Sequence, residues 1–291
     1  MRFINDPPKR VAIVARPTMP GAPEEARQIE ASLNAAGVST TQWTSLSDED
    51  LRRRLGKGEF NILMAMGGDG TMLHAGRLCG PFGVPVLGVN LGRFGFLAEV
   101  KRGEWARVLP DLVAGHFRLE ERMMIRAEHF RGEHLLRQWD VLNEMVVCRG
   151  QFIRPITLQA SVDGYVLATY IADGLIAATP TGSTAYALAA GGPIMPPEMR
   201  NILIVPVAPH LSVDRAVVLS EGACVNIKAL SDHDVVASAD GQDSVSLEDG
   251  DEIHIAASSH TARFIRFQDP GYFYRNLTQY MEQNPAAGSA S

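Results

Sequence analysis

Residues 62–78 read ILMAMGGDGTMLHAGRL, an apolar run followed by a glycine-rich turn with a central acid and then a helix-compatible segment. The pattern predicts a buried strand over 62–66, a turn over 67–71 and a helix over 72–78. Glycines let backbone N–H groups approach a phosphate closely, and a helix N-terminus adds partial positive charge. Asp69 is unexpected there, because a carboxylate repels phosphate unless a metal ion intervenes or the acid accepts a proton from an attacking hydroxyl. The turn therefore indicates phosphoryl transfer more than nucleotide binding alone.

The segments around this turn continue the same alternation of strands and helices. Short β-rich runs predict strands over 11–15, 38–43 and 84–90. A helix is predicted over 22–36, closed by Gly37, and a second over 51–55 with Ser47 as its N-cap. This βαβα order predicts a Rossmann-like α/β domain with a parallel sheet, whose ligand sites lie at the carboxyl ends of the strands.

The pattern changes to many short strands from Leu119 onward. The predicted strands are 123–130, 139–148, 156–162, 165–179, 202–207, 216–219, 224–229, 235–239, 244–247 and 252–256. Asp163-Gly164 and Asp240-Gly241 are typical of tight hairpin turns. We therefore expect an α/β domain over 1–118 and an all-β, β-sandwich-like domain over 119–264. A predicted helix over 272–283 and its flanks, residues 265–285, are expected to return to the first domain.

Composition narrows the classes of function. The chain has 291 residues, 46% of them hydrophobic, and a net charge of −6 with no basic stripe, so a nucleic-acid partner is not expected. The three cysteines are far apart and fit reduced thiols in a cytosol, and the eight histidines do not show a zinc spacing. No apolar run reaches about 18 residues and the N-terminal residues lack a secretory pattern, so we expect a cytoplasmic protein without a membrane partner.

A second glycine- and hydroxyl-rich cluster, DGLIAATPTGSTAYALAAGGP, covers residues 173–193. Its hydroxyls surround Gly182 and precede a helix-like run over 185–190, so the cluster offers N–H and O–H donors to a phosphate or a ribose. The simpler alternative is an N-capping loop, which needs only Thr181 or Ser183.

Two further stretches have open interpretations. Asn143-Glu144 interrupts the predicted strand 139–148, where it could hold adenine edges or a ribose diol, or could be a solvent-facing bulge. The segment 90–97, NLGRFGFL, could be a ligand loop, or a crossover with Phe94 and Phe96 in a core. The sequence contains no GxGxxG, GxxxxGK or GxSxG motif, which counts against an ordinary dehydrogenase, a P-loop enzyme and a serine hydrolase.

Taken together, these residues resemble the NAD kinases of bacteria over about Arg10 to Tyr280. The resemblance rests on GGDGT at 67–71, NLGRFGFL at 90–97, LEERMMI at 119–125, NEMVV at 143–147, DGLIAATPTGSTAYALAAGGPI at 173–194 and ADGQ at 239–242. GGDGT alone is shared with lipid kinases and phosphofructokinases, whereas the 173–194 segment is far more specific.

The resemblance implies transfer of the ATP γ-phosphoryl group to the 2′-hydroxyl of the adenosine ribose of NAD, giving NADP. It also implies a divalent cation, Mg²⁺ above all, carried with ATP, and no metal held by the protein itself. Such enzymes are homo-oligomers, dimers or tetramers, whose sites borrow residues from a neighbouring subunit.

The resemblance also implies roles for individual residues. Asp69 is the catalytic acid that engages the 2′-hydroxyl. Positions similar to the family's NAD-binding residues are Asp69, Gly70, Phe96, Asn143, Glu144, Asp173, Thr184, Ala185, Tyr186, Ala208 and His210, with Ala208 and His210 at positions contributed across the subunit interface. ATP phosphate contacts are expected at Gly67, Gly68, Gly70 and Thr71.

Two departures and two alternatives remain at this point. Ala178 and Ala189 stand where many relatives have serine, which weakens a side-chain hydrogen bond at Ala189. A diacylglycerol- or sphingosine-type lipid kinase could use the same GGDGT turn, and a catalytically silent NADP-binding sensor could keep the fold. The sequence leaves open the phosphoryl donor (ATP, another triphosphate or polyphosphate), the choice between NAD and NADH, and feedback regulation.

Overall fold

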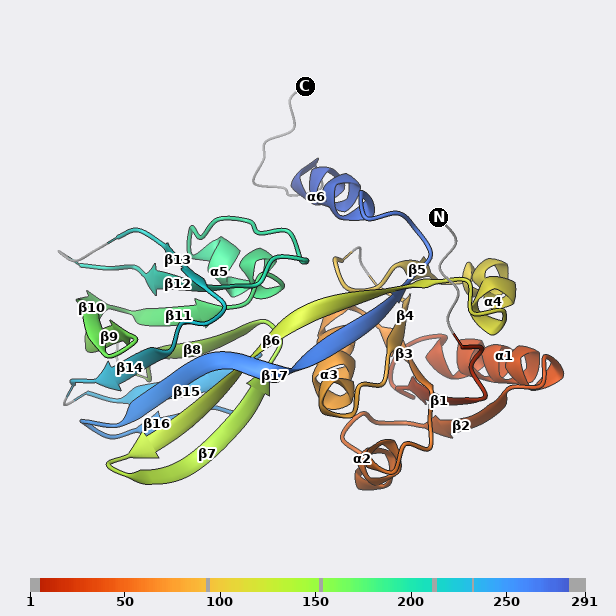
Figure 1. Ribbon diagram of the computed structural model, residues 1–291, viewed down its shortest axis with the longest axis horizontal. Coiled ribbons are helices and arrows are strands. Elements are labelled where there is room, and N and C mark those ends of the chain that lie inside the picture. The colour runs from red at the N-terminus through yellow and green to blue at the C-terminus, as the bar shows by residue number, and fades with distance from the viewer. Residues whose placement is uncertain (1–5, 93–94, 152–153, 211–213, 232, 283–291) are drawn as a thin grey trace. The chain divides into compact units, whose positions relative to one another are not determined.

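The computed structural model describes residues 6–92, 95–151, 154–210, 214–231 and 233–282 (Figure 1). The chain divides into two compact units, an α/β unit of Met1–Glu121 with Ala262–Ser291 and a β unit of Arg122–Thr261. Two long strands, β6 (Arg118–Arg131) and β17 (Glu252–Arg266), contribute residues to both units. Within the described residues, the helices are all too short or too polar to cross a membrane.

A parallel sheet forms the centre of the α/β unit. Its strands are β1 (Arg10–Ala15), β2 (Ser39–Trp43), β3 (Ile62–Gly67), β4 (Val86–Asn90) and the short β5 (Val100–Lys101). The order is β2-β1-β3-β4, with β5 and the end of β17 also parallel to β4. Strands β3 and β4 are buried along their whole length, as their continuous apolar sequences predict.

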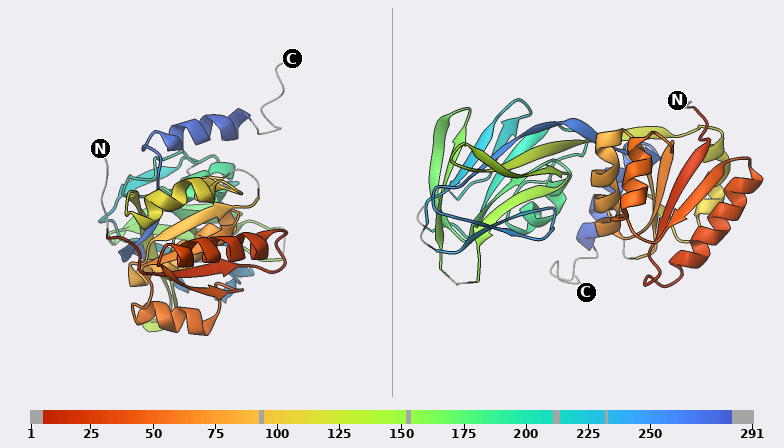
Figure 2. Two further views of the ribbon diagram at one scale, coloured as in Figure 1. Left: turned by 90° about the vertical axis from the view of Figure 1, so that its right-hand side faces the viewer. Right: turned by 90° about the horizontal axis from the view of Figure 1, so that it is seen from below.

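Helices cover both faces of this sheet (Figure 2). They are α1 (Ala22–Ala35), α2 (Glu49–Gly56), α3 (Asp69–Cys79) and α4 (Trp105–Val113), with a 3-10 turn, η1, over Gly80–Phe82. Apolar residues of α1 and α4 pack with Leu87 and Val89 of β4. The intervening Gly88 faces Met72 of α3, because a Cβ on Gly88 would lie 2.5 Å from the Met72 sulfur. Alternation along β4 thus places α3 opposite α1 and α4.

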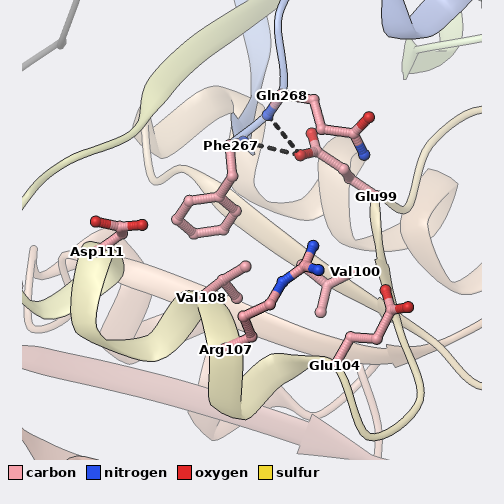
Figure 3. A pocket seen from close by; sticks show the side chains of 8 residues that line it. All are labelled: Glu99, Val100, Glu104, Arg107, Val108, Asp111, Phe267 and Gln268. Atoms are coloured by element: carbon pink, nitrogen blue, oxygen red, sulfur yellow. Dashed lines mark hydrogen bonds between the residues drawn. The ribbon is translucent and has the colours of Figure 1, made fainter.

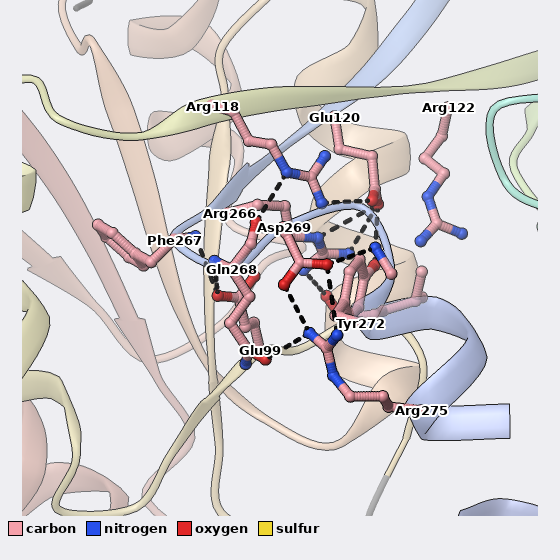
Figure 4. Close-up of polar contacts among 12 residues, drawn as sticks. Glu99, Arg118, Glu120, Arg122, Arg266, Phe267, Gln268, Asp269, Tyr272 and Arg275 are labelled. Carbon is pink, nitrogen blue, oxygen red and sulfur yellow. Dashed lines mark hydrogen bonds and ion pairs between the residues drawn. The ribbon is translucent and has the colours of Figure 1, made fainter. Parts of the chain in front are cut away.

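The C-terminal helix α6 (Tyr272–Glu282) returns to the α/β unit, as predicted. Arg266 is buried and donates hydrogen bonds to the Glu120 carboxylate at 2.9 Å and to the Leu97 carbonyl at 2.7 Å (Figure 4). The Tyr272 hydroxyl donates to the same carboxylate at 3.1 Å. The ring of Phe273 packs on that of Phe96, with centroids 5.9 Å apart. A buried ion pair and an aromatic contact therefore anchor the first turn of α6.

The β unit is a sandwich of two antiparallel sheets. One contains β10 (Tyr165–Ala172), β9 (Ile156–Val162), β14 (Val225–Ala229) and β17 in that order, with β6 pairing β17 and β7 (His134–Val141). The other has the order β13 (Val217–Ser220), β12 (Asn201–Val207), β11 (Gly174–Ala178), β8 (Glu144–Arg149), β15 (Val235–Ala239), β16 (Val245–Leu247). Residues of both sheets share one core. The predicted pair of an α/β domain and a β-sandwich-like domain is confirmed.

A small helical segment covers the outer face of the second sheet. It consists of a 3-10 turn, η2 (Gly182–Thr184), and the helix α5 (Tyr186–Ala189). Ala187 and Met195 pack on Ile176, Leu203 and Val205 of β11 and β12. This face of the sheet is therefore buried under the segment that the sequence marks as a ligand cluster.

Several predicted boundaries are wrong. Asp48, not Ser47, caps α2, because its carboxylate accepts hydrogen bonds from the N–H groups of Asp50 and Leu51. The predicted strand 139–148 is two strands, β7 and β8, separated by Leu142 and Asn143. The predicted strand 165–179 likewise divides at Asp173. The sequence does not predict helix α4. It also does not predict the continuation of β17 to Arg266, because polar and apolar residues alternate only irregularly there.

Candidate active site

The glycine-rich turn lies at the carboxyl end of β3, where β3 becomes α3. Helix α3 begins at Asp69, three residues before the predicted start, with Gly68 as its N-cap residue. Three glycines of the turn, Gly67, Gly68 and Gly70, do not have the positive φ of the left-handed region, so a plain left-handed turn does not explain why they are glycine. A Cβ on Gly67 would lie 2.2 Å from the Thr71 hydroxyl, whereas Cβ atoms on Gly68 and Gly70 would meet no described atom within 4 Å. Gly68 and Gly70 thus leave the helix N-terminus open to a ligand.

The Asp69 carboxylate is held by the loop that follows β4. Its two oxygens accept hydrogen bonds from the N–H groups of Phe96 at 2.7 Å and Leu97 at 3.2 Å. Gly95 makes this possible, because a Cβ there would lie 2.2 to 2.5 Å from three atoms of the carboxyl group. Each oxygen keeps a second lone pair that can accept a hydroxyl proton. Asp69 is therefore fixed in orientation and remains half-buried at the sheet edge.

This edge is also the switch point of the sheet. Strand β1 lies between β2 and β3, so the connections leaving β1 and β3 run in opposite directions along the sheet. Ligands of open α/β sheets bind outside the carboxyl ends of strands at such a point. The turn 67–71 lies there, as the sequence predicts.

Phe96 and Phe94 have different outcomes. The Phe96 side chain is 7% exposed and packs on Phe273, so the core interpretation holds for its ring; a contact with adenine stays a prediction. Phe94 lies outside the described residues.

In the β unit, Asn143 and Glu144 lie at the start of β8, beside the turn after β15. The carboxylate of Asp240 accepts hydrogen bonds from three successive N–H groups, those of Leu142 (2.9 Å), Asn143 (2.8 Å) and Glu144 (3.1 Å). Asp240 has φ of 49° and Gly241 φ of 66°, as expected for the predicted hairpin turn. The sequence marks ADGQ as a turn and as a family motif, but it does not predict this contact with the Asn-Glu pair.

Glu144 is a buried acid in this cluster. Only 8% of the Glu144 surface is exposed. Burial, and secondly the negative charge of Asp240, raise the pKa of Glu144 to about 8, although the N–H of Tyr186 donates to it and opposes the shift. The Oε2 atom is buried with no hydrogen-bond partner among the described residues. A buried, unpaired carboxyl oxygen indicates a place for a ligand group.

The hydroxyls of the 179–184 segment build the loop itself. The Thr179 hydroxyl donates to the Leu142 carbonyl at 2.5 Å, that of Ser183 to the Pro180 carbonyl at 2.6 Å and that of Thr184 to the Thr181 carbonyl at 3.1 Å. Thr181 is the N-cap residue of η2, as the alternative interpretation has it, but neither its side chain nor that of Ser183 makes a capping hydrogen bond in the described structure. The Thr184 oxygen can still accept from a ligand.

This loop packs tightly against the Asn-Glu pair. A Cβ on Gly182 would lie 2.1 Å from the Asn143 carbonyl oxygen, and the same oxygen accepts the N–H of Thr179 at 2.8 Å. Ala178 at the end of β11 pairs with Glu144. The structure therefore brings together five predicted residues at one end of β11 and in the segment that follows it: Asn143, Glu144, Thr184, Ala185 and Tyr186.

The other predicted residues of the β unit lie at the opposite end of β11. Asp173 precedes β11 and pairs with Arg149 at 3.1 Å. Ala208 and His210 follow β12, whose Val207 pairs with Gly174. Both are exposed, and the N–H of His210 donates to the Ile171 carbonyl at 2.7 Å. Five strand residues separate the two groups by about 15 Å, so within one β unit they do not form one cluster.

Metal ligands and cavities add two observations. Among the described residues, His, Cys, Asp and Glu side chains do not gather in any group of three or more that could hold a metal ion. A cavity of about 240 Å³ in the α/β unit is lined by Glu99, Val100, Glu104, Arg107, Val108, Asp111, Phe267 and Gln268 (Figure 3). Its lining includes none of the predicted site residues, so it does not belong to the clusters above.

Comparison with known proteins gives consistent results for both units. Residues 23–117 match the family described as ATP-NAD kinase N-terminal domain, and residues 142–267 match ATP-NAD kinase C-terminal domain. The NAD kinase of Chloroflexus aurantiacus is 36% identical over 276 residues, which cover 95% of this chain and 99% of that protein. The NAD kinase of Syntrophotalea carbinolica is 38% identical over 273 residues, covering 91% and 95% of the two chains.

Solved structures resemble the chain as well. An NAD kinase from Archaeoglobus fulgidus in complex with ATP superposes with a TM-score of 0.76 at 28% identity and covers 94% of this chain and 98% of its own. The yeast NADH kinase complexed with NADH superposes with a TM-score of 0.84 at 24% identity, covering 99% and 90%, which supports the fold alone.

Proposed function

Since the chain belongs to the NAD kinase family and has that family's activity, we propose the chemistry of its reaction. The reaction transfers the ATP γ-phosphoryl group to the 2′-hydroxyl of the adenosine ribose of NAD, giving NADP. It would thus be a phosphotransferase with an alcohol group as acceptor. Matches to both domains of ATP-NAD kinases leave the lipid kinase alternative without support.

The observation that carries this proposal is the fixed carboxylate of Asp69 at the N-terminus of α3. Two backbone N–H groups orient it, and Gly68 and Gly70 leave space beside it. A ribose hydroxyl is a poor nucleophile, and phosphoryl transfer is catalysed chiefly by alignment and charge stabilisation. We therefore assign Asp69 the task of accepting the hydrogen bond of the 2′-hydroxyl and receiving its proton late in the transfer.

The turn also suits the phosphates of the donor. The N–H groups of Gly68 and Gly70 lie at the N-terminus of α3, where helices bind anions. The N–H of Thr71 donates to the Gly68 carbonyl at 2.9 Å, so a phosphate contact of Thr71 would use its hydroxyl. Gly67 contributes by making room for Thr71. ATP is the proposed donor, because the similar archaeal NAD kinase is solved in complex with it. Mg²⁺ entering on the triphosphate would offset the repulsion between phosphate and Asp69.

The β unit is proposed to hold the dinucleotide. Asn143 and Glu144 offer an amide and a carboxyl group to the nicotinamide-side ribose, and Tyr186, 44% exposed, offers a ring beside them. Asp173, Ala208 and His210 lie at the other end of β11, which fits a homo-oligomer in which these residues serve a neighbouring subunit. A dimer or tetramer in the cytoplasm is the proposed form.

The test is the Asp69→Asn variant. It should bind NAD within a few-fold of the wild type while turnover falls at least about a hundredfold, because the amide cannot receive the proton. NAD binding is measured by calorimetry and NADP formation by a coupled assay. Near-normal turnover would refute the assigned role of Asp69.

A further inference from the structure

We propose that Asp240 is a positioning residue that fixes the Asn143-Glu144 backbone and holds Glu144 as a neutral carboxylic acid, which donates a hydrogen bond from Oε2 to a hydroxyl oxygen of the bound dinucleotide. The inference rests on the proposed role of the Asn-Glu pair in holding NAD. It assigns a function to Asp240 and a protonation state to Glu144, and it predicts how NAD affinity depends on pH.

The positioning role follows from the number of hydrogen bonds on one short segment. Three successive N–H groups, from Leu142 to Glu144, all point to the carboxylate of Asp240, almost a hundred residues away in the chain. The carbonyl groups of Leu142 and Asn143 accept hydrogen bonds from the hydroxyl and the N–H of Thr179. Both sides of this backbone are therefore fixed between β15 and the loop after β11. The directions of the Asn143 and Glu144 side chains depend on that clamp.

The protonation state follows from what faces Glu144. The turn after β15 contributes the negative Asp240, β11 contributes the uncharged Ala178, and α5 contributes the N–H of Tyr186. Three N–H groups compensate the charge of Asp240, whereas Glu144 receives one and is buried. When two carboxyl groups share a site in this way, the less stabilised one keeps its proton. Its pKa of about 8 agrees with that assignment.

The orphaned oxygen gives the proton a direction. The N–H of Tyr186 donates to the Glu144 carboxyl group, and Oε2 is buried with no hydrogen-bond partner in the described part of the chain. A protonated carboxyl group has one O–H donor, and an unmade buried hydrogen bond is costly. A ribose hydroxyl oxygen can accept that bond. An ionised glutamate could only accept a hydrogen bond, so the protonated and the ionised states predict opposite changes of NAD affinity with pH.

The experiment measures NAD binding by calorimetry from pH 6.5 to 9.5, together with KM for NAD, KM for ATP and kcat. For the wild type, affinity should fall as pH rises through about 8, approaching tenfold per pH unit above it. Glu144→Gln keeps a donor, so its affinity at pH 7 should stay within about threefold of the wild type and lose the pH dependence. Glu144→Ala should bind at least about tenfold more weakly at pH 7.

The Asp240 variants separate its two tasks. Asp240→Asn removes the charge but keeps an acceptor, so the fall in affinity should move to lower pH. Asp240→Ala removes the clamp and should raise KM for NAD about tenfold or more with KM for ATP unchanged. Asp163→Ala is the matched control: Asp163 also begins a hairpin turn with positive φ (51°), and its carboxylate accepts one N–H, from Cys224. This control should keep the wild-type pH profile.

The outcomes distinguish this inference from the proposed function. If Glu144→Gln binds NAD as weakly as Glu144→Ala at pH 7, or if wild-type affinity rises with pH through 8, Glu144 acts as an ionised acceptor and the inference is wrong. An unmoved pH profile in Asp240→Asn would also overturn it. If Glu144→Ala binds NAD like the wild type, the proposed dinucleotide site itself fails.

Discussion

Replacing Gly95 with alanine should displace the carboxylate of Asp69, the proposed proton acceptor, without changing its chemistry. The new Cβ would lie 2.2 Å from Oδ1, 2.3 Å from Cγ and 2.5 Å from Oδ2 of Asp69, whereas ordinary contacts begin near 3.4 Å. The carboxyl group must therefore move by about 1 Å, a misplacement that costs roughly a hundredfold in rate where alignment controls the reaction. The hydrogen bonds from Phe96 and Leu97 would lengthen together, with a loss of about 2 kcal/mol in the free energy of unfolding.

The assay compares kcat for NADP formation, the Kd for NAD and the melting temperature. We expect kcat to fall about a hundredfold. The melting temperature should fall by about 4–8 °C for a protein of this size. The Kd for NAD should stay within about threefold, since the dinucleotide is proposed to be held chiefly by the β unit. Gly222→Ala is the control, because Gly222 is exposed and a Cβ there meets no described atom within 4 Å. If Gly95→Ala kept kcat within threefold and an unchanged melting temperature, Asp69 would not be held as the structure has it.

Three further variants test other parts of the structure. Gly182→Ala places a Cβ 2.1 Å from the Asn143 carbonyl oxygen, so the Kd for NAD should rise about tenfold or more while KM for ATP is unchanged; equal effects on both substrates would contradict the reasoning. Arg266→Met leaves the buried Glu120 carboxylate without its main partner and should lower the free energy of unfolding, measured by urea titration, by about 3–5 kcal/mol. The double variant Arg266→Met, Glu120→Leu removes the carboxylate as well and should recover this stability. For Asp251, burial opposes ionisation, but hydrogen bonds from Arg131, the Glu248 N–H and His129 hold its pKa at about 2. Because this pKa is lower than the 3.8 of the unfolded chain, the ionised carboxylate stabilises the fold above about pH 4 by about 2 kcal/mol, and this contribution disappears as pH falls towards 2. In urea titrations from pH 7 to 3, the free energy of unfolding of Asp251→Asn should therefore decrease less with falling pH than that of the wild type.

The sequence predicts the fold class well because its strongest signals are local. The buried strands 62–67 and 86–90 are continuous apolar runs, and the turn between β3 and α3 is marked by glycine. Boundaries fail where a single tertiary contact decides them. The break between β7 and β8 depends on Asp240, which binds the N–H groups that a continuous strand would use in its ladder. No pattern within 139–148 contains that information.

The candidate site likewise has a part that the sequence predicts and a part that only the tertiary structure supplies. The sequence predicts Asp69, Asn143 and Glu144 as site residues from residue type and neighbourhood, and the structure shows what holds each of them. The contact of Asp69 with Phe96 and Leu97 joins residues 27 and 28 positions apart through backbone N–H groups, which have no sequence signature. The hydroxyls of 179–184 were expected to face a ligand because of their number. The protons of the Thr179, Ser183 and Thr184 hydroxyls instead go to carbonyl groups of the loop and of Leu142, since a tight buried turn leaves many carbonyl groups that need donors.

The glycines of the three motifs at 67–71, 90–97 and 173–194 therefore have two different physical causes, although they look alike in the sequence. Gly67, Gly95 and Gly182 lie where another atom of the protein occupies the space of a Cβ, so a side chain there must disturb geometry and stability together. Gly68 and Gly70 face open space at the N-terminus of α3, so alanine there should leave the melting temperature nearly unchanged and act only on what approaches from outside. If Gly70→Ala raised KM for ATP about tenfold with no loss of stability, the open face of the turn would be the phosphate site. If it lowered stability as Gly95→Ala does, the turn would be rigid for packing alone, and the phosphates would have to bind elsewhere.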